Sequence, residues 1–201
     1  MKMLNLTNIL NLITGRATLY PRLSDWARKY PDLIKIGEGT YGNRIYCEIY
    51  NQDTKLIIGK YCSVATDVSF LLGGNHRKDW GTTYPFPALW KEAYHISGHP
   101  MSKGDIIVGN DVWIGHRSII LSGSRLHDGV IVGAGSVVAS QEFPPYSIIS
   151  GNPARVTGYR FAQPIIDGLL QLRWWDWPEN KIIKHLDLMC SENVAELLKL
   201  G

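Results

Sequence analysis

Histidine is the side chain best suited to proton transfer near neutral pH, and one stretch of the chain concentrates it. The 201-residue sequence contains six histidines, and His76, His95 and His99 all fall between residues 71 and 105. His76 follows Gly73-Gly74-Asn75, where the backbone can bend sharply. His76 is therefore a candidate general base that removes a proton from a hydroxyl or an amine. The same position also suits a histidine that only terminates a turn.

The spacing of the possible ligands disfavours a metal site. His95 and His99 are four positions apart, a spacing at which a helix could present both rings to a metal ion. Gly98 and Pro100 disfavour a helix there, and no third ligand is evident, so we expect no metal. The three cysteines are odd in number and form no CxxC pair, which favours a reducing compartment and a cytoplasmic protein.

A six-residue repeat predicts the scaffold that must hold these histidines. An apolar residue recurs at every sixth position, and small or β-branched residues follow four positions after most of them. The apolar column is Val108, Ile114, Ile120, Leu126, Val132 and Val138. A parallel β-helix needs this pattern, because each flat face takes one inward aliphatic side chain and each corner takes a small residue.

An antiparallel sheet is the alternative, but it predicts a period of two with turns about every 8–12 residues. Fragments of the same hexads occur earlier, at Ile36, Ile58, Val64 and Phe70. We expect these fragments to form preceding coils, with Tyr41–Thr54 inserted irregularly. The fold predicted is mainly β: a parallel β-helix with a long inserted loop and a C-terminal helical tail.

The segments that flank the repeat predict helices. Gln163–Leu172 and Glu179–Leu188 each carry apolar residues on one side, and Ser191 is placed to cap a last helix. The tryptophans between residues 174 and 177 predict a packing anchor. Near the start, Leu4–Ile13 predicts a short amphipathic helix rather than a cleaved signal peptide.

These patterns divide the chain into three parts. We expect an N-terminal extension over residues 1–35, the β-helix over 36–160 with its loop at 71–105, and the helical tail over 161–201. The chain is 45% apolar and 19% charged, so it can bury a core. A net charge of only +3, with no basic run, disfavours nucleic acid as a partner. No stretch of about 18 apolar residues predicts a membrane-spanning helix.

Four motifs, in their order along the chain, resemble those of the xenobiotic acetyltransferases, a branch of the hexapeptide acyltransferases. The motifs are GGNHRKDW, GDIIVGNDVWIG, SGNPAR and RF…LL…RWWDWP, and the resemblance covers roughly Ile36–Leu188. It implies a left-handed parallel β-helix that assembles as a homotrimer. It also implies acetyl-CoA as the co-substrate and active sites in grooves between neighbouring subunits.

The resemblance assigns roles to individual residues. His76 matches the family's catalytic histidine, a general base that lets the acceptor oxygen attack the thioester directly, without an acetyl-enzyme. The residues that match the acetyl-CoA groove are Trp113, His116, Ala134, Ala139, Ser140 and Arg155. Trp113 also suits plain packing, and Arg155 also suits a solvated surface charge. Many relatives carry a Thr-Lys pair where this chain has Ala139-Ser140-Gln141-Glu142, which removes one expected phosphate contact.

The long loop is also the expected acceptor site. Trp80 and Tyr84 could stack on a ring, and Asp79 could accept hydrogen bonds from hydroxyls. We therefore expect a small hydroxylated or amino acceptor, and first an antibiotic such as chloramphenicol or a streptogramin.

Other functions remain open at this point. The first alternative is sugar O- or N-acetylation in cell-envelope polysaccharide synthesis, and a distant one is a non-catalytic scaffold. A metal-dependent lyase like the gamma-class carbonic anhydrases is disfavoured, because no two histidines are five positions apart.

Overall fold

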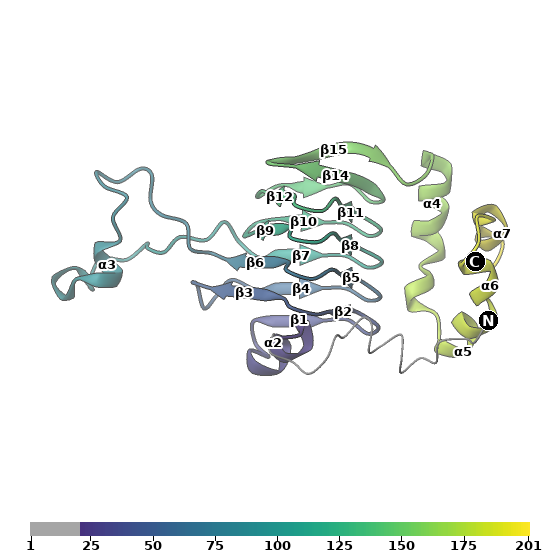
Figure 1. The fold of residues 1–201 in the computed structure, drawn as a ribbon, viewed down its shortest axis with the longest axis horizontal. Coiled ribbons are helices and arrows are strands. Elements are labelled where there is room, and N and C mark those ends of the chain that lie inside the picture. Colours follow the sequence, from purple (N-terminus) through teal and green to yellow (C-terminus); the bar gives the residue numbers. More distant parts are fainter. Residues whose placement is uncertain (1–20) are drawn as a thin grey trace.

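The computed structural model describes residues 21–201, and its centre is a stack of short parallel strands (Figure 1). The chain passes through three sheets in turn, and one such passage is called a coil. Sheet A contains β1 (Ile34–Ile36), β4 (Leu56–Ile58), β7 (Ile106–Val108), β10 (Arg125–Leu126) and β13 (Glu142–Phe143). Sheet B contains β2 (Tyr41–Gly42), β5 (Ser63–Val64), β8 (Trp113–Ile114), β11 (Ile131–Val132), β14 (Ser147–Gly151) and β15 (Ala154–Tyr159). Sheet C contains β3 (Tyr46–Ile49), β6 (Ser69–Leu72), β9 (Ile119–Leu121) and β12 (Val137–Val138).

The apolar column of the repeat forms the core of this stack. All six of its members, from Val108 to Val138, are at most 2% exposed. Successive coils stack one inward aliphatic residue on another, so that Ile114 pairs with Val64 on one side and with Val132 on the other. The three sheets are parallel, as the period of six predicts, and they fit a left-handed parallel β-helix. The antiparallel alternative is wrong for all strands but β15, which pairs antiparallel with β14.

Buried serines close the corners. Ser118, Ser124 and Ser136 are at most 1% exposed, at the corner positions that the repeat predicts. The hydroxyl of Ser124 donates to the Leu121 carbonyl at 2.6 Å, and that of Ser136 donates to the Gly133 carbonyl at 2.6 Å. A small hydroxyl suits this place because a buried polar group must find a partner, and a backbone carbonyl three residues earlier supplies one.

The expectation that Tyr41–Thr54 is an irregular insert was wrong. Its strands β2 and β3 complete the first coil, with Gly42 paired to Val64 and Cys47 paired to Phe70. The repeat is hidden because a glycine stands at the inward position and Cys47 follows it after five residues instead of six. A side chain at Gly42 would crowd Val64, since its Cβ would lie 3.0 Å from the Cβ of Val64.

A short helix covers the first coil. Helix α2 (Leu23–Lys29) buries Leu23 to 1% exposure against the core. Its Trp26 indole donates to the Ile45 carbonyl at 2.7 Å, which ties the helix to the coil. The predicted helix at Leu4–Ile13 lies outside the described residues.

The C-terminal elements build a second, smaller core. They are α4 (Gln163–Leu172), η2 (Trp174–Asp176), α5 (Glu179–Lys184), α6 (Leu186–Met189) and α7 (Val194–Leu198). Trp175 is 1% exposed, in agreement with the predicted packing anchor. The predicted helix Glu179–Leu188 is interrupted at His185, and α7 begins after Asn193 rather than at Ser191. Ser191 instead accepts a hydrogen bond from the Asn193 N–H at 3.1 Å. None of the helices within the described residues has the length and apolar character needed to cross a bilayer.

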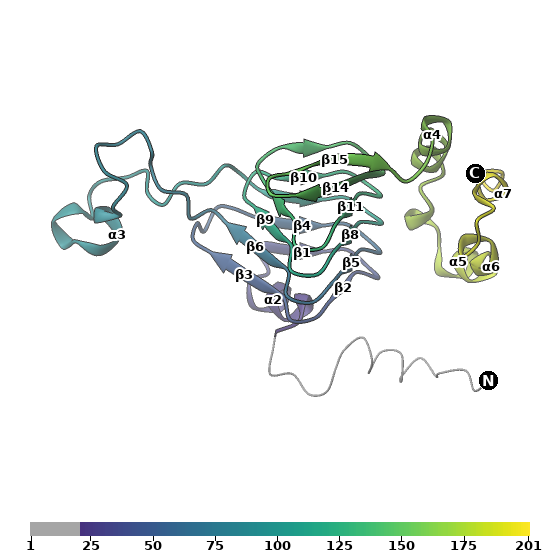
Figure 2. The same ribbon diagram turned by 45° about the horizontal axis from the view of Figure 1, so that its top comes forward.

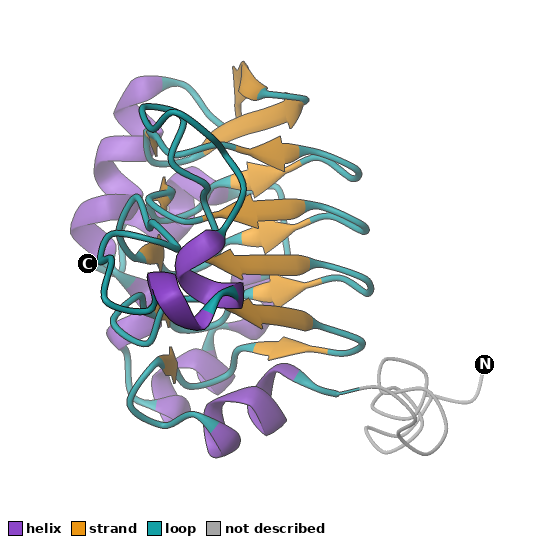
Figure 3. Cartoon of the chain, turned by 90° about the vertical axis from the view of Figure 1, so that its left-hand side faces the viewer, coloured by secondary structure: helices purple, strands orange, loops and turns teal. Residues whose placement is uncertain are grey.

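One long excursion interrupts the stack. It leaves β6 after Leu72, carries α3 (Phe86–Leu89) and η1 (Lys91–Ala93), and returns to β7 at Ile106. It projects from the side of the stack opposite the C-terminal helices (Figures 1 and 2). In Figure 3 the excursion lies in front of the stacked strands. The fold therefore presents the histidine-rich segment on an arm that projects from the stack.

The core column makes a direct prediction for stability. Ile58 is 2% exposed and points inward, whereas its neighbour Ile57 is 36% exposed on the outer face of the same strand. Ile58→Ala should lower the free energy of unfolding by about 2–5 kcal/mol, because it removes buried methyl groups and leaves a cavity. Ile57→Ala is the matched control and should cost much less. Denaturant unfolding of both variants checks this, and equal losses would contradict the inward assignment.

Candidate active site

Two asparagines hold the base of the excursion. The side-chain amide of Asn51 donates to the Pro100 carbonyl at 2.8 Å, and its carbonyl accepts from the Gly74 N–H at 3.3 Å. Asn75 and Met101 exchange two backbone hydrogen bonds, of 2.9 and 2.8 Å. Both ends of the arm are therefore joined to each other and to the turn that follows β3.

The same base is fixed to the next coil. The Asn75 amide donates to the Ser122 hydroxyl at 3.2 Å, and Ser122 is 2% exposed. The two glycines before Asn75 are required by close approach. Both have positive φ, and a Cβ at Gly73 would lie 1.8 Å from Oδ1 of Asn51. The Gly-Gly-Asn sequence thus places the next residue, His76, at a defined point beside the turns that connect sheet C to sheet A, here called the C–A edge.

His76 has a defined proton arrangement. Its Nδ1 lies 2.6 Å from the backbone carbonyl oxygen of Thr83. A carbonyl only accepts, so Nδ1 carries the hydrogen and donates it. The lone pair is then on Nε2, and the side chain is exposed. An imidazole held in this tautomer can accept a proton at Nε2 from a molecule that approaches from solvent.

A second imidazole packs against the first. The rings of His76 and His99 have centroids 4.9 Å apart and planes at 88°. Both ring nitrogens of His99 are buried and have no hydrogen-bond partner among the described residues. Burial, together with the proximity of His76, lowers the pKa of the His99 imidazole.

The outer part of the arm combines an ion pair with an aromatic cavity. Arg77 pairs with Asp79 and lies over the Trp80 ring at 5.4 Å, and the hydrogen bond from Arg77 holds the pKa of Asp79 at about 2. A cavity of about 320 Å³ lies beside this pair. Its lining residues are Trp80, Gly81, Thr82, Tyr84, Phe86, Pro87 and Ile96. Asp79, Trp80 and Tyr84, the residues predicted to bind the acceptor, thus lie on one arm. Trp80 and Tyr84 also line the same apolar cavity.

The residues predicted to bind acetyl-CoA fall into two groups. Trp113, which is 53% exposed, lies on the outer face of β8 in sheet B. His116 and Ala134 lie on the turns from sheet B to sheet C, here called the B–C edge, where Nδ1 of His116 is 2.9 Å from the Thr66 hydroxyl. The exposed Arg155 belongs to the end of β15 that pairs with Ser150, next to the same edge.

The second group shares the C–A edge with His76. Ala139 and Ser140 are half-buried in the turn after β12, and the Ser140 hydroxyl donates to the Gly123 carbonyl at 3.4 Å. Sheet C separates this turn from the one that carries His116. Within one chain, the structure brings His76 to the edge of Ala139 and Ser140 and not to the edge of His116.

Comparison with known proteins decides the family. Residues 105–140 match the family model for the bacterial transferase hexapeptide (six repeats). A chloramphenicol acetyltransferase of Morganella morganii is 39% identical over 182 residues, which are 83% of this chain and 86% of that protein. The chain belongs to the xenobiotic acetyltransferases. It is therefore an acyltransferase.

A further relative agrees with this assignment, and a solved structure shares the fold. A probable macrolide acetyltransferase of Lysinibacillus sphaericus is 43% identical over 72% of this chain and 82% of that protein. The structure of AntD, an N-acyltransferase from Bacillus cereus, superposes with a TM-score of 0.50 at 18% identity, covering 78% of this chain and 82% of that one. At that identity the structural likeness shows the fold alone.

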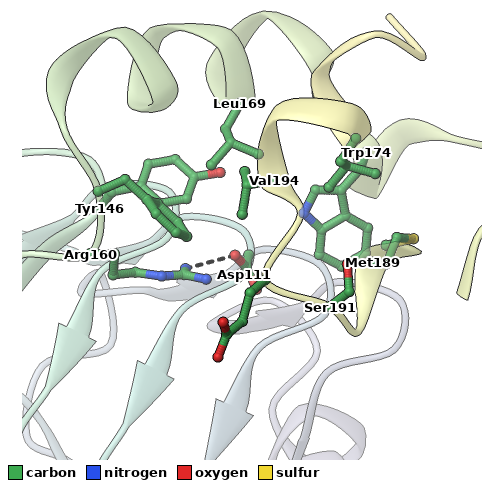
Figure 4. A pocket seen from close by; sticks show the side chains of 11 residues that line it. Asp111, Tyr146, Arg160, Leu169, Trp174, Met189, Ser191 and Val194 are labelled. Carbon is green, nitrogen blue, oxygen red and sulfur yellow. Dashed lines mark hydrogen bonds and ion pairs between the residues drawn. The ribbon is translucent and has the colours of Figure 1, made fainter. Parts of the chain in front are cut away.

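A larger cavity lies away from all of these residues. It encloses about 420 Å³ between the A-to-B turns and the C-terminal helices (Figure 4). These helices lie on the side of the stack opposite the excursion (Figure 1). Arg160 donates to Asp111 there at 2.8 Å, and the buried Tyr146 hydroxyl has no partner among the described residues. Burial raises the pKa of the Asp111 carboxyl, and the Arg160 guanidinium opposes that shift. None of the predicted site residues lines this cavity.

Three contributors to the site were not identified from the sequence. The Thr83 carbonyl acts through the backbone, so its residue type carries no signal. Asn51 lies in the segment that the sequence predicts to be irregular, and the spacing of His95 and His99 points to no role for His99 other than that of a metal ligand. Within the described residues no group of three or more possible ligands could hold a metal ion.

The Asn51 clamp makes a prediction. Asn51→Ala removes the hydrogen bonds to Pro100 and Gly74, so the arm should open at its base while the core column remains. We expect faster tryptic cleavage within residues 76–103, at least about a tenfold loss of activity, and little change in the unfolding midpoint. The exposed neighbour provides the control, Gln52→Ala, which should behave like the unmodified protein. An arm as resistant to trypsin as before would show that the clamp is dispensable.

Proposed function

We propose that the protein moves the acetyl group of acetyl-CoA to a hydroxyl of a small antibiotic, with His76 as the general base. The observation that carries this proposal is the 2.6 Å contact of His76 Nδ1 with the Thr83 carbonyl, which leaves a lone pair on Nε2 of an exposed residue. Membership in the family supports the donor and the acceptor class. Relatives are named for chloramphenicol, macrolide and virginiamycin A acetylation.

His76 performs both proton transfers. A thioester supplies an activated acetyl group, and the acceptor oxygen attacks its carbonyl carbon. Nε2 of His76 removes the hydroxyl proton as the new ester bond forms, and the imidazolium returns that proton to the sulfur that leaves. Protons therefore balance without any other acid.

The cysteines of the solenoid do not suit a covalent route. Cys47 and Cys62 are buried, and burial raises the pKa of their thiols to about 12 and about 11. A thiol that stays protonated at neutral pH and cannot meet solvent is a poor nucleophile. The burial of these two cysteines therefore favours direct attack by the acceptor on the thioester, as the resemblance implies.

The residues of the B–C edge suit the donor. The exposed Trp113 indole offers an apolar surface for the pantetheine chain, and His116 and Ala134 lie on the adjoining turns. The exposed Arg155 guanidinium suits a phosphate, because its planar donors match phosphate oxygens. Ala139 and Ser140 extend the proposed path on the C–A edge.

The separation of the two edges supports a homotrimer. His76 and Trp113 lie on different sides of sheet C, so neither edge alone contains both the base and the donor surface. In an assembly around a threefold axis, the C–A edge of one copy can face the B–C edge of the next. We propose that left-handed solenoids pack in this way and complete each site between two subunits.

The cavity on the arm supports an acceptor with an aromatic or apolar body. Trp80 and Tyr84 offer ring faces, and the exposed Asp79, next to Trp80 in the sequence, offers oxygens to hydroxyls. Thiol release from acetyl-CoA with chloramphenicol, a streptogramin, a macrolide and a panel of nucleotide sugars tests the acceptor class. Turnover with an antibiotic supports the proposal, and turnover with sugars alone contradicts its acceptor.

Removing the base should remove most of the activity. His76→Ala should lower kcat by about 10²–10⁴-fold while the unfolding midpoint stays the same, because the exposed ring supports no core. His95→Ala, an exposed histidine on the same arm, is the matched control and should keep nearly full activity. Steady-state kinetics on folded variants decides this. A His76→Ala enzyme with near-normal kcat would refute the assignment.

The phosphate contact has a separate kinetic signature. Arg155→Ala should raise KM for acetyl-CoA more than it lowers kcat. A contact to the phosphates is remote from the thioester and is made equally in the ground state and the transition state, so its loss weakens binding and not the chemical step. Raising the salt concentration should reduce the difference in KM for acetyl-CoA between the Arg155→Ala variant and the unmodified enzyme, because salt screens an exposed ion pair. An unchanged KM would remove Arg155 from the proposed groove.

A further inference from the structure

His99 contacts His76 in a way that the proposed proton transfers do not yet use. One ring meets the other edge to face, with centroids 4.9 Å apart and planes at 88°. The Thr83 hydrogen bond fixes one atom of the His76 ring but leaves the ring free to swing about that contact. The ring of His99 packs against one side of the His76 ring and so restricts such a swing.

The surroundings of His99 show how it can act. Both of its ring nitrogens are buried and make no hydrogen bond to any described residue, so it acts through the shape of its ring and not as a proton relay. His76 is the titratable group in ring contact with it, and Arg77, which pairs with Asp79, lies close to the preceding residue. Nη1 of Arg77 reaches within 3.3 Å of the Cβ position of Gly98, the residue before His99.

Neutrality is the second requirement. Burial, with His76 close by, lowers the pKa of His99 and so favours its uncharged ring. Two cations about 5 Å apart would repel each other, and that repulsion would oppose proton uptake by the base. The position next to His76 therefore suits an uncharged ring, and that ring does not need to form hydrogen bonds.

We propose that His99 is a positioning residue, whose ring holds the plane of His76 so that Nδ1 stays on the Thr83 carbonyl and Nε2 faces the acceptor. This inference rests on the proposed role of His76 as the base. It assigns to His99 a part in the acetyl transfer that is distinct from metal binding and from contact with either substrate.

Two substitutions separate ring shape from hydrogen bonding. His99→Phe keeps an uncharged ring at the same place and removes two buried polar atoms, so kcat should stay within about threefold and the unfolding midpoint should not fall. His99→Ala removes the ring, and kcat should fall by about 10- to 100-fold with KM for acetyl-CoA unchanged. A phenylalanine variant as impaired as the alanine variant would overturn the proposal, because ring packing would then not be the function of His99.

A double-mutant cycle tests whether His99 acts through His76. In a His76→Ala background, His99→Ala should lower the residual rate no further, because there is no base left to position. An equal loss in both backgrounds would show that His99 only maintains the arm, and would overturn the proposal.

Nuclear magnetic resonance provides a readout that does not depend on turnover. The ¹⁵N shifts of the His76 ring should report the Nδ1–H tautomer in the unmodified protein and in His99→Phe, and a mixture of tautomers in His99→Ala. If His76→Ala keeps its activity, the proposed function fails, yet these shifts still decide whether His99 orders the ring. Identical spectra in all three proteins would overturn the positioning role by itself.

Discussion

The vertical stacking of inward aliphatic side chains sets the height of every strand and every corner in this protein. Because Val64, Ile114 and Val132 lie one above another, the turns that leave their strands also stack in columns. A slip of one residue would turn the core residues outward, so the register is fixed strongly. The C–A and B–C edges are consequences of that register, and the residues proposed for chemistry are carried on them.

The proposed chemistry depends on an arm that departs from this regularity. Its base is fixed by Asn51, Asn75 and Ser122, so a segment that projects far from the core still begins at a defined point. His76 is the first residue beyond that base, and the Thr83 carbonyl returns from further along the arm to orient it. The solenoid supplies position, the arm supplies the imidazole, and a neighbouring copy is proposed to supply the donor surface.

The sequence was informative where one residue type repeats under a single constraint. The hexads after Val108 predicted the parallel coils and the small residues at their corners, because the inward positions from Val108 to Val138 are all aliphatic and buried. The first coil was not recognised in the sequence, because Gly42 has no side chain that would mark its inward position. The His76 tautomer and the contact with His99 could not be predicted from the sequence, because they depend on how a long segment folds back on itself. Neither contact leaves a periodic trace in the sequence.

The most direct test of the account is the structure of the assembled protein with acetyl-CoA and an acceptor antibiotic. It should show the thioester between Trp113 of one subunit and His76 of the next, with the acceptor hydroxyl within hydrogen-bond reach of Nε2. A thioester bound where no His76 from any subunit can reach the acceptor hydroxyl would contradict the central claim that this imidazole is the base.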